Sequence, residues 1–365
     1  MVWGDYLSFE YGKPVKDKQS IDGNVPVFGT NGQIGTSHLP PLCKIPSFVV
    51  GRKGAYRGVH YSSVPFSVID TAFYALPLTD KVDLKWAYYK FLTYDINRMD
   101  SGSAIPSTDR YELYKIEVEI PSLETQKKIV SVLDVFENII RVNSEINENL
   151  LQQARALFRK WFSITSSGLY KLSDIADINP ETYSPKENWS FVNYLDTSNI
   201  TSGTINEVQY IIPSEEKLPS RARRILRKDD VVFSTVRPNQ LHYGIISNPK
   251  PNMLGSTGFA VIRSKYETMP NEIIYLALTE SAFVEQMQQL AEQSVSTFPS
   301  IRPADLDACV LPEPKEDDNN FMETIKSIFN AVAINNEENQ RLATLRDTLL
   351  PRLMSGELDV SSLDF

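Results

Sequence analysis

Apolar residues recur with the spacing of a packed helix in two long stretches of the chain. Alternating steps of four and three residues from Ile129 fall on apolar side chains or asparagines, which is the seam of a helix packed along a partner helix. The first seam is Ile129, Leu133, Phe136, Ile140, Asn143, Asn147, Leu150, Ala154, Leu157 and Trp161. Adding 192 to each number gives Phe321, Ile325, Ile328, Val332, Asn335, Asn339, Leu342, Arg346, Leu349 and Leu353. The chain therefore contains an internal repeat, which only the step from Ala154 to Arg346 breaks.

Two asparagines lie in the middle of each seam. A buried asparagine costs stability and is tolerated where it fixes register, so these positions predict two helices that face each other. The repeat extends upstream, because SAIPS (103–107) matches STFPS (296–300) at an offset of 193, and Pro121 matches Pro314 at the same offset. An ideal helix over 124–162 would be roughly 58 Å long. We therefore expect a rod that separates two globular heads.

Each half begins with a β-leaning, turn-rich stretch and ends with a long helix, which predicts an α+β fold. Strands are predicted at 26–29, 47–51, 73–76 and 116–120, and then at 190–195, 208–212, 230–236, 258–263 and 308–311. Shorter helices are predicted at 83–96 and 271–293. FGTNGQIG (28–35) lacks the spacing of a phosphate-binding glycine loop and predicts a hairpin with Asn31 and Gly32 at its tip.

The length of 365 residues suits two or three domains, and 42% hydrophobic with 23% charged residues is typical of a soluble globular protein. The sequence contains neither an apolar run long enough to span a bilayer nor the pattern of a signal peptide at its start. Cys43 and Cys309 form no CxxC pair, which favours buried thiols and a reducing, cytoplasmic setting.

Charge is unevenly distributed along the chain. The formal net charge of −9 argues mildly against a nucleic-acid partner, but an acidic total can hide a basic face. The stretch 313–320 is acidic, whereas 221–228 holds five arginines and lysines. Arginine and lysine neutralise phosphates, and arginine, asparagine and glutamine can read base edges. The DNA-binding candidates are Arg221, Arg223, Arg224, Arg227, Lys228, Arg237, Asn239 and Gln240, with Arg52, Lys53, Tyr56 and Arg57 in the first half; solvated loop charge is the alternative interpretation.

The residue patterns of a catalytic centre are missing. His38, His60 and His242 have no ligand-like spacing, and no phosphate-binding loop with a following lysine is present. INPETY (178–183) lacks the Asn-Pro-Pro-aromatic run of amino-methyltransferases. We therefore expect a binding protein with no bound metal and no catalysis of its own.

Several motifs, in order and within the repeat, resemble the specificity (S) subunits of type I restriction–modification enzymes. PVFGTNGQIG (26–35) and FVVGRKGAYRG (48–58) resemble the start of a target recognition domain in that family, as does YKLSDIADINP (170–180). IPSLETQKKIVSVLD (120–134), with Gln126, is similar to the family's proline-to-helix junction, and LRDTLLPRLMSGEL (345–358) to its C-terminal helix end. The resemblance covers nearly the whole chain.

This resemblance implies two target recognition domains held apart by two antiparallel helices. It implies a target recognition domain at 1–120, a spacer helix at 121–165, a second recognition domain at 166–314 and a second spacer helix at 315–358. Each domain would read one part of a split double-stranded DNA target, which we expect to be asymmetric because the halves differ. The helices would dock two methyltransferase (M) subunits, and restriction (R) subunits through them. S-adenosylmethionine, ATP and Mg²⁺ would bind to those partners.

Three alternatives remain at this stage. The chain could be a DNA-binding adaptor of the same fold that serves a different or single-chain restriction–methylation machine. An enzyme using serine and aspartate would need a nucleophile–base pair that the sequence does not reveal. A purely structural coiled-coil protein would not need two large, different heads.

Pro351, which has no counterpart in the first helix, predicts that the second helix bends or stops near its end.

Overall fold

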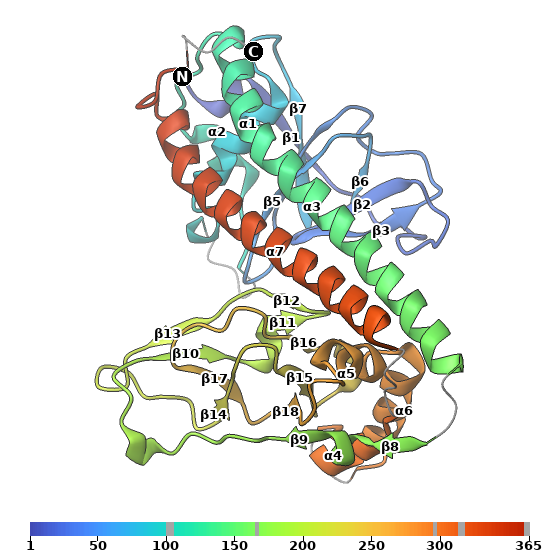
Figure 1. The fold of residues 1–365 in the computed structure, drawn as a ribbon. Helices are drawn as coiled ribbons and strands as arrows, with labels where there is room; N and C mark the ends of the chain where they lie inside the picture. The colour runs from blue at the N-terminus through green and yellow to red at the C-terminus, as the bar shows by residue number, and fades with distance from the viewer. Residues whose placement is uncertain (100–105, 165–167, 295–297, 313–317, 361–365) are drawn as a thin grey trace. The chain divides into compact units, whose positions relative to one another are not determined.

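The computed structural model describes residues 1–99, 106–164, 168–294, 298–312 and 318–360. The chain divides into two compact units, of which the first is made of two segments and the second of one. Unit 1 is 1–141 with 339–365, and unit 2 is 142–338. Each unit therefore takes part of both long helices, which are α3 (Leu123–Ile164) and α7 (Asn319–Met354) (Figure 1).

Unit 1 is built on two sheets. The antiparallel sheet has the order β1-β7-β4-β5, and the smaller sheet has the order β3-β2-β6, with β2 and β6 parallel. The elements are the 3-10 helix η1 (Trp3–Asp5), β1 (Leu7–Tyr11), β2 (Val25–Gly29), β3 (Gly32–Ser37), β4 (Ser47–Gly51), β5 (Val59–Ser62), β6 (Ser67–Val68), β7 (Ala72–Pro77), α1 (Leu84–Leu92), η2 (Ile96–Arg98) and α2 (Arg110–Lys115). Helix α1 packs on β4, β5 and β7.

Unit 2 repeats this plan with more strands. Its antiparallel sheet has the order β9-β18-β15-β16, and a second sheet, β13-β10-β17-β14, pairs β10 with β17 in parallel. The elements are β8 (Leu169–Lys171), α4 (Leu172–Ile175), β9 (Ala176–Ile178), η3 (Pro185–Glu187), β10 (Val192–Leu195), η4 (Thr197–Asn199), β11 (Ile200–Thr201), β12 (Thr204–Ile205), β13 (Gln209–Ile211), β14 (Ala222–Ile225), β15 (Val231–Ser234), η5 (Pro238–Gln240), β16 (Tyr243–Ile245), β17 (Met253–Ser256), β18 (Phe259–Ser264), α5 (Asn271–Leu278), α6 (Ser281–Glu292), η6 (Pro303–Ala308) and β19 (Val310–Pro312).

The antiparallel sheets of the two units correspond strand by strand, in the orders β1-β7-β4-β5 and β9-β18-β15-β16. Strand β4 pairs with β7 and β5, as β15 pairs with β18 and β16, and α5 packs on β15, β16 and β18 as α1 packs on its own sheet. The parallel pair β2 and β6 corresponds to β10 and β17. The α+β fold class predicted from the sequence is confirmed, and the sequence repeat is a repeat of topology.

A glutamine at the start of α3 joins the sheets of unit 1 to the long helix. The Gln126 side chain is fully buried, accepts from the backbone N–H of Asp83 at 2.8 Å and donates to the carbonyl oxygens of Lys81 and Pro121 at 2.9 Å. Asp83 in turn caps α1, accepting from the N–H groups of Lys85 and Trp86 at 2.9 Å. The proline-to-helix motif of the sequence therefore fixes α1 and α3 to one another.

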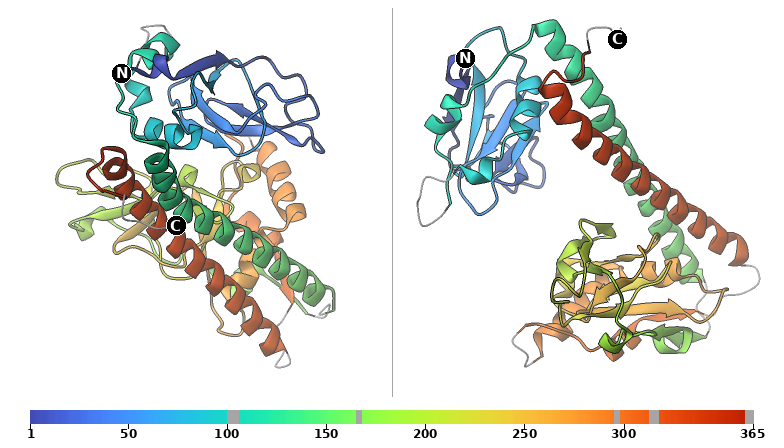
Figure 2. Two further views of the ribbon diagram at one scale, coloured as in Figure 1. Left: turned by 90° about the horizontal axis from the view of Figure 1, so that it is seen from above. Right: turned by 90° about the vertical axis from the view of Figure 1, so that its left-hand side faces the viewer.

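The long helices pack antiparallel within each unit, because partner numbers on α7 fall as numbers on α3 rise (Figures 1 and 2). In unit 1, Arg346 donates to Glu137 at 2.7 Å. In unit 2, Asn143 donates to Glu338 at 2.8 Å, and Asn335 donates to Asn147 at 2.8 Å. The buried asparagine layer of unit 2 thus pairs α3 with α7 through side-chain hydrogen bonds, which specify register.

The predicted seams lie along the helix pair, with one correction. The remaining α7 seam residues, from Ile325, Ile328 and Val332 to Asn339, Leu342, Leu349 and Leu353, are buried or half-buried, as are Ile129, Leu133, Phe136, Ile140 and Leu150 on α3. Leu157 is wrong as a seam residue because it is exposed, whereas its neighbour Phe158 is buried. The last turns of α3 contact the body of unit 2, where Arg155 donates to the carbonyl oxygen of Thr279 at 3.1 Å, and Trp161 still stacks on Phe321 of α7.

Several predicted boundaries differ from the structure. The stretch 116–120 forms no strand, only an isolated bridge between Val2 and Glu117. The predicted helix 271–293 is two helices, interrupted where the Thr279 hydroxyl donates to the carbonyl oxygen of Tyr275 and Glu280 adopts extended backbone.

The turn between β2 and β3 and the end of α7 also differ in detail from the sequence predictions. The β2–β3 hairpin turns at Thr30 and Asn31, one residue earlier than predicted, because Gly32 already pairs with Gly29. Helix α7 does not stop at Pro351 but ends at Met354. Residues 103–105 of SAIPS, 296–297 of STFPS and 313–317 of the acidic stretch, with Pro314, lie outside the described residues. Within the described ranges, neither long helix nor any shorter one combines the length and apolar character of a membrane span.

Candidate nucleic-acid interface

The basic segment of unit 1 divides into exposed and buried side chains. Lys53 and Tyr56 are exposed, and Arg52 is half-buried with one N–H donated to the carbonyl oxygen of Asp70 at 3.1 Å. Arg57 is only 2% exposed, and its guanidinium donates to the carbonyl oxygens of Asn97 at 2.6 Å and Met99 at 3.3 Å. Arg57 therefore supports the fold of unit 1 and offers no face to a phosphate, which corrects its listing as a DNA-binding candidate.

The five cations of 221–228 in unit 2 also have different surroundings. Arg221 and Lys228 are exposed. Arg223 and Arg224 are half-buried on β14, and each has one buried guanidinium nitrogen without a hydrogen-bond partner in the described structure. Burial lowers the pKa of the Arg224 guanidinium. Of this cluster, Arg221 and Lys228 are the members best placed to meet a ligand.

Arg227 belongs to an ion-pair network. It donates to Glu181 at 2.8 and 3.2 Å, and Glu181 also accepts from Arg263 at 2.6 Å. Arg263 in turn donates to both oxygens of the fully buried Asp230, at 2.7 and 2.9 Å. The bonds from Arg227 and Arg263 lower the pKa of Glu181 to about 2. The charge of Arg227 is therefore paired with Glu181, although its side chain is 60% exposed.

The other candidates of unit 2 follow β15. Arg237, Asn239 and Gln240 are all exposed. Arg237 adopts a left-handed conformation with φ of 47°, and its guanidinium lies over the ring of Phe298 at 5.4 Å. The backbone N–H of Asn239 donates to Gln288 at 3.2 Å, which fixes the η5 turn to α6. Arginine in this backbone conformation is strained, and such strain is often retained at functional sites.

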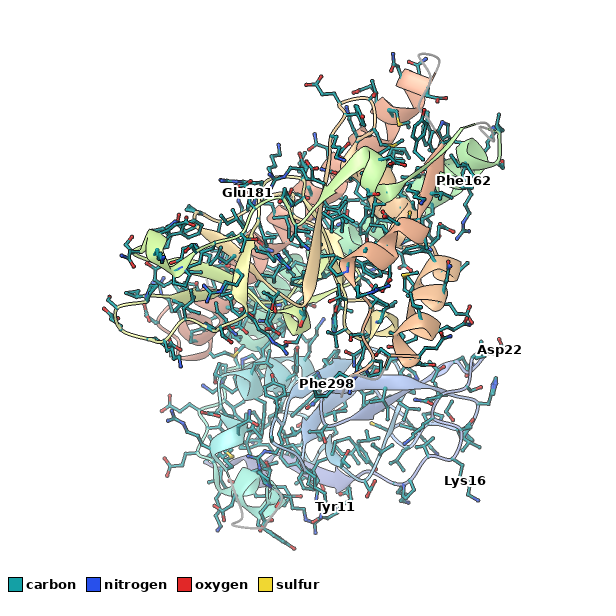
Figure 3. All side chains as sticks on the ribbon, turned by 90° about the horizontal axis from the view of Figure 1, so that it is seen from below. Tyr11, Lys16, Asp22, Phe162, Glu181 and Phe298 are labelled. Atoms are coloured by element: carbon teal, nitrogen blue, oxygen red, sulfur yellow. The ribbon has the colours of Figure 1, made fainter. Side chains whose placement is uncertain are left out.

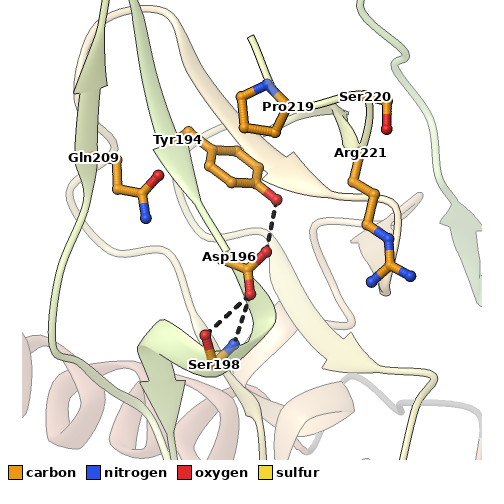
Figure 4. A pocket seen from close by; sticks show the side chains of 7 residues that line it. All are labelled: Tyr194, Asp196, Ser198, Gln209, Pro219, Ser220 and Arg221. Atoms are coloured by element: carbon orange, nitrogen blue, oxygen red, sulfur yellow. Dashed lines mark hydrogen bonds between the residues drawn. The ribbon is translucent and has the colours of Figure 1, made fainter. Parts of the chain in front are cut away.

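An open hollow of about 460 Å³ lies in unit 2 near Arg221. Figure 4 shows the side chains that line it, which are Tyr194, Asp196, Ser198, Gln209, Pro219, Ser220 and Arg221. Tyr194 donates its hydroxyl to Asp196 at 2.7 Å. Burial, together with the bond to Asp196, raises the pKa of Tyr194 to about 12. Burial also raises the pKa of Asp196, but bonds from Tyr194 and Ser198 outweigh it and leave the pKa below its ordinary value.

At neutral pH this hollow therefore presents a carboxylate, an amide and a guanidinium within one concave surface. These are the groups that pair with cytosine, adenine and guanine edges. Of these residues only Arg221 is predicted from the sequence, because clustered cations are the local signal of a nucleic-acid interface. Tyr11 and Arg110 in unit 1 were also missed, since they lie far apart in the sequence and meet only through the fold.

Metal ligation has no support in the described ranges, where no group of three or more histidine, cysteine or acidic side chains is close enough to hold an ion. Burial lowers the pKa of His60, whose Nε2 has no hydrogen-bond partner among the described residues.

The chain resembles known proteins in both sequence and fold. Residues 10–152 match the family model of the type I restriction modification DNA specificity domain. The MjaIX specificity subunit of Methanocaldococcus jannaschii is 24% identical over 309 residues, which are 78% of this chain and 71% of that protein. The HindI specificity subunit of Haemophilus influenzae is 27% identical over 139 residues, 38% of this chain and 30% of that protein.

The crystal structure of the S subunit of a type I system from M. genitalium has the same fold. It aligns with a TM-score of 0.59 at 16% identity and covers 97% of this chain and 95% of that one. The model match spans most of unit 1 and the first part of α3, and the fold match extends over unit 2. The resemblance predicted from the sequence is confirmed.

Proposed function

We propose that the chain is a specificity subunit of the type I restriction–modification kind, a subunit that recognises a DNA sequence, and that it reads a split, asymmetric target. The observation that carries this proposal is the repeated topology of units 1 and 2. A fold used twice in one chain can present two reading surfaces. The corresponding loops differ in sequence, because Arg52, Lys53 and Gly54 follow β4 whereas Thr235, Val236 and Arg237 follow β15. Different loops on a shared fold favour different half-targets.

We propose that direct base reading in unit 2 takes place at the hollow beside Arg221. Arginine can bond guanine, glutamine can bond adenine, and a carboxylate can accept from cytosine, each in the major groove. Exposed Lys228, Asn239 and Gln240 would add contacts to phosphates or base edges. This assignment rests on residue chemistry and exposure.

The long helices are proposed to dock the methyltransferase subunits. In unit 1, Val135 and Ile139 on α3 are 50% and 37% exposed, and in unit 2, Val142 and Ile146 are 41% and 44% exposed. Each pair is spaced by one helical turn, so each part of α3 presents neighbouring apolar side chains to solvent. An apolar strip of this kind is typical of a protein–protein contact.

Catalysis is proposed to belong to the partners. Two methyltransferase subunits would bind to this chain, and restriction subunits would bind through them. S-adenosylmethionine, ATP and Mg²⁺ would bind to those methyltransferase and restriction subunits. The complex would then methylate adenine and cleave DNA, in the cytoplasm, where the free thiols of Cys43 and Cys309 would stay reduced.

The test is a methylome. The chain is co-expressed with the methyltransferase encoded beside it, in a host without DNA methylation of its own, and modified bases are mapped with and without the chain. A split, asymmetric motif that depends on the chain is the expected result. A palindromic motif would contradict the asymmetric reading. Unchanged methylation, together with failure of the two proteins to co-purify, would favour an adaptor for a different machine.

A further inference from the structure

Two arginines share one tyrosine ring in unit 1. The guanidinium carbons of Arg52 and Arg110 each lie 4.8 Å from the ring centroid of Tyr11. Tyr11 is the last residue of β1 and is labelled in Figure 3. Arg110 also lies 5.2 Å from the Tyr111 centroid, and its Nε is buried without a hydrogen-bond partner in the described structure. Neither arginine forms an ion pair with any carboxylate in the described ranges. One ring thus carries two guanidinium groups that have no carboxylate partner among the described residues.

Backbone hydrogen bonds create this arrangement. The loop after β4 is tied to the segment before α2, because Thr108 N–H donates to the carbonyl oxygen of Arg52 at 2.8 Å and Gly54 N–H donates to that of Pro106 at 3.0 Å. Lys53 and Ser107 form the bridge between these two bonds. We call the two tied segments, 52–54 and 106–108, the strap of unit 1.

Unit 2 contains the same strap. Ile301 N–H donates to the carbonyl oxygen of Thr235 at 2.9 Å, Arg237 N–H donates to that of Pro299 at 3.0 Å, and Val236 bridges to Ser300. The strap of unit 2 is therefore 235–237 with 299–301. Bond for bond, Arg237 occupies the position of Gly54, and both have positive φ, 47° and 126°.

We propose that the strap is the DNA-backbone contact common to both units, with Arg52 and Arg110 on Tyr11 binding phosphate in unit 1 and Arg237 on Phe298 binding phosphate in unit 2. The inference rests on the proposed function and adds the site and chemical class of the contact. A guanidinium stacked over a ring keeps the N–H edges in its own plane, which suits a phosphate oxygen. The proposed ligand is the phosphodiester, because it carries the negative charge that arginines without a carboxylate partner among the described residues can neutralise.

The backbone conformation of Arg237 indicates whether this arginine serves ligand binding or the stability of unit 2. Glycine is the residue that adopts positive φ without strain, and the corresponding position in unit 1 is a glycine. Glycine at this position would make unit 2 more stable than arginine does, so stability does not explain the arginine. Binding of a ligand by the guanidinium does explain why the strained backbone is tolerated. The contact with Phe298, which is 54% exposed, then orients the side chain at the surface.

The first experiment measures binding of the full chain, with its methyltransferase, to a short duplex of unrelated sequence over a range of salt concentrations. Arg52→Gln and Arg110→Gln are each expected to reduce the slope of log K against log salt by about 1, and the double variant by about 2. Arg98→Gln is the matched control, because this exposed arginine of unit 1 is already paired with Asp95 at 2.9 Å. Slopes equal to wild type in all variants would overturn the proposal for unit 1.

The second experiment uses Arg237→Gly. We expect an unchanged or raised Tm together with a several-fold loss of DNA affinity and a slope reduced by about 1. A lowered Tm with unchanged affinity would show a structural arginine and overturn the proposal for unit 2. The outcomes distinguish failure of the strap proposal from failure of the proposed function. If the wild-type complex directs methylation and the strap variants bind DNA normally, only the strap proposal is rejected. A wild-type complex that binds no DNA rejects both.

Discussion

Units 1 and 2 use arginine in opposite ways, although they share a topology. Unit 2 has the denser cluster, yet Arg227 is bound to Glu181 and the same carboxylate also holds Arg263. The basic segment of unit 1 is sparser, yet Arg52 and Arg110 lie over Tyr11 without a carboxylate partner among the described residues. The number of cations in a segment is therefore a poor guide to its free charge, because acidic partners arrive from distant segments. Four changes test this contrast, in order of expected effect.

Asp230→Ala should produce the largest loss of stability. It removes the buried carboxylate that accepts both bonds from Arg263, and leaves that guanidinium without its main partner. Breaking a buried ion pair from one side costs about 3–5 kcal/mol. Denaturant unfolding followed by tryptophan fluorescence measures the change. Lys228→Ala, two residues away and exposed, is the control and should remain within about 0.5 kcal/mol of wild type. Equal effects of the two variants would contradict the role given to the network.

Arg57→Met tests the buried arginine of unit 1. The carbonyl oxygens of Asn97 and Met99 would lose their donor inside the protein, at a cost of about 2 kcal/mol in the free energy of unfolding. Lys53→Met, in the same segment but exposed, should leave the free energy of unfolding nearly unchanged. If DNA affinity per folded molecule fell more in Arg57→Met than in Lys53→Met, Arg57 would have to be returned to the binding face.

Arg221→Ala tests the hollow of unit 2. Removal of this exposed guanidinium should weaken binding to the cognate duplex by about tenfold, about 1.4 kcal/mol, with little change in Tm. Arg227→Ala is the matched comparison, because it removes the same residue type from the same cluster. Its charge is already paired with Glu181, so we expect the smaller loss of affinity and the larger loss of Tm. Fluorescence anisotropy at fixed salt measures the binding, and the reverse order of affinities would exclude Arg221 as the principal contact.

Acid titration tests Glu181. Its pKa in the folded protein is about 2, below the ordinary 4.5, so its contribution is complete above about pH 4.5 and declines as pH falls toward 2. The side chain is 31% exposed, so solvent screening limits that contribution to about 1 kcal/mol. The stability difference between wild type and Glu181→Gln should therefore be constant from pH 5 to 7 and shrink below pH 4. A difference that grows on acidification would contradict the assignment.

The sequence predicted the repeat, the long helices and most strands, because hydrophobic periodicity and turn residues are local signals. It also placed Asn147 and Asn335 on facing seams, and the two side chains are hydrogen-bonded. It could not predict that Arg57 is buried, since that depends on carbonyl groups forty residues away. The pairing of Arg227 with Glu181 likewise depends on tertiary contacts, as does the stacking of Arg52 and Arg110 on Tyr11. Leu157 is 36% exposed although Trp161, one turn later, still stacks on Phe321 of α7, so the regular seam spacing does not predict the burial of each position.

The two cysteines give each unit its own reporter of opening. Cys43 belongs to unit 1 and Cys309 to unit 2, both thiols are free and buried, and the sequence contains no other cysteine. Burial raises the pKa of Cys43, and that of Cys309 to about 12, so neither is a reactive thiolate while its surroundings stay closed. The rate at which a thiol reagent labels each position therefore follows the transient opening of that unit. Labelling with and without DNA would show which half is held shut by the target.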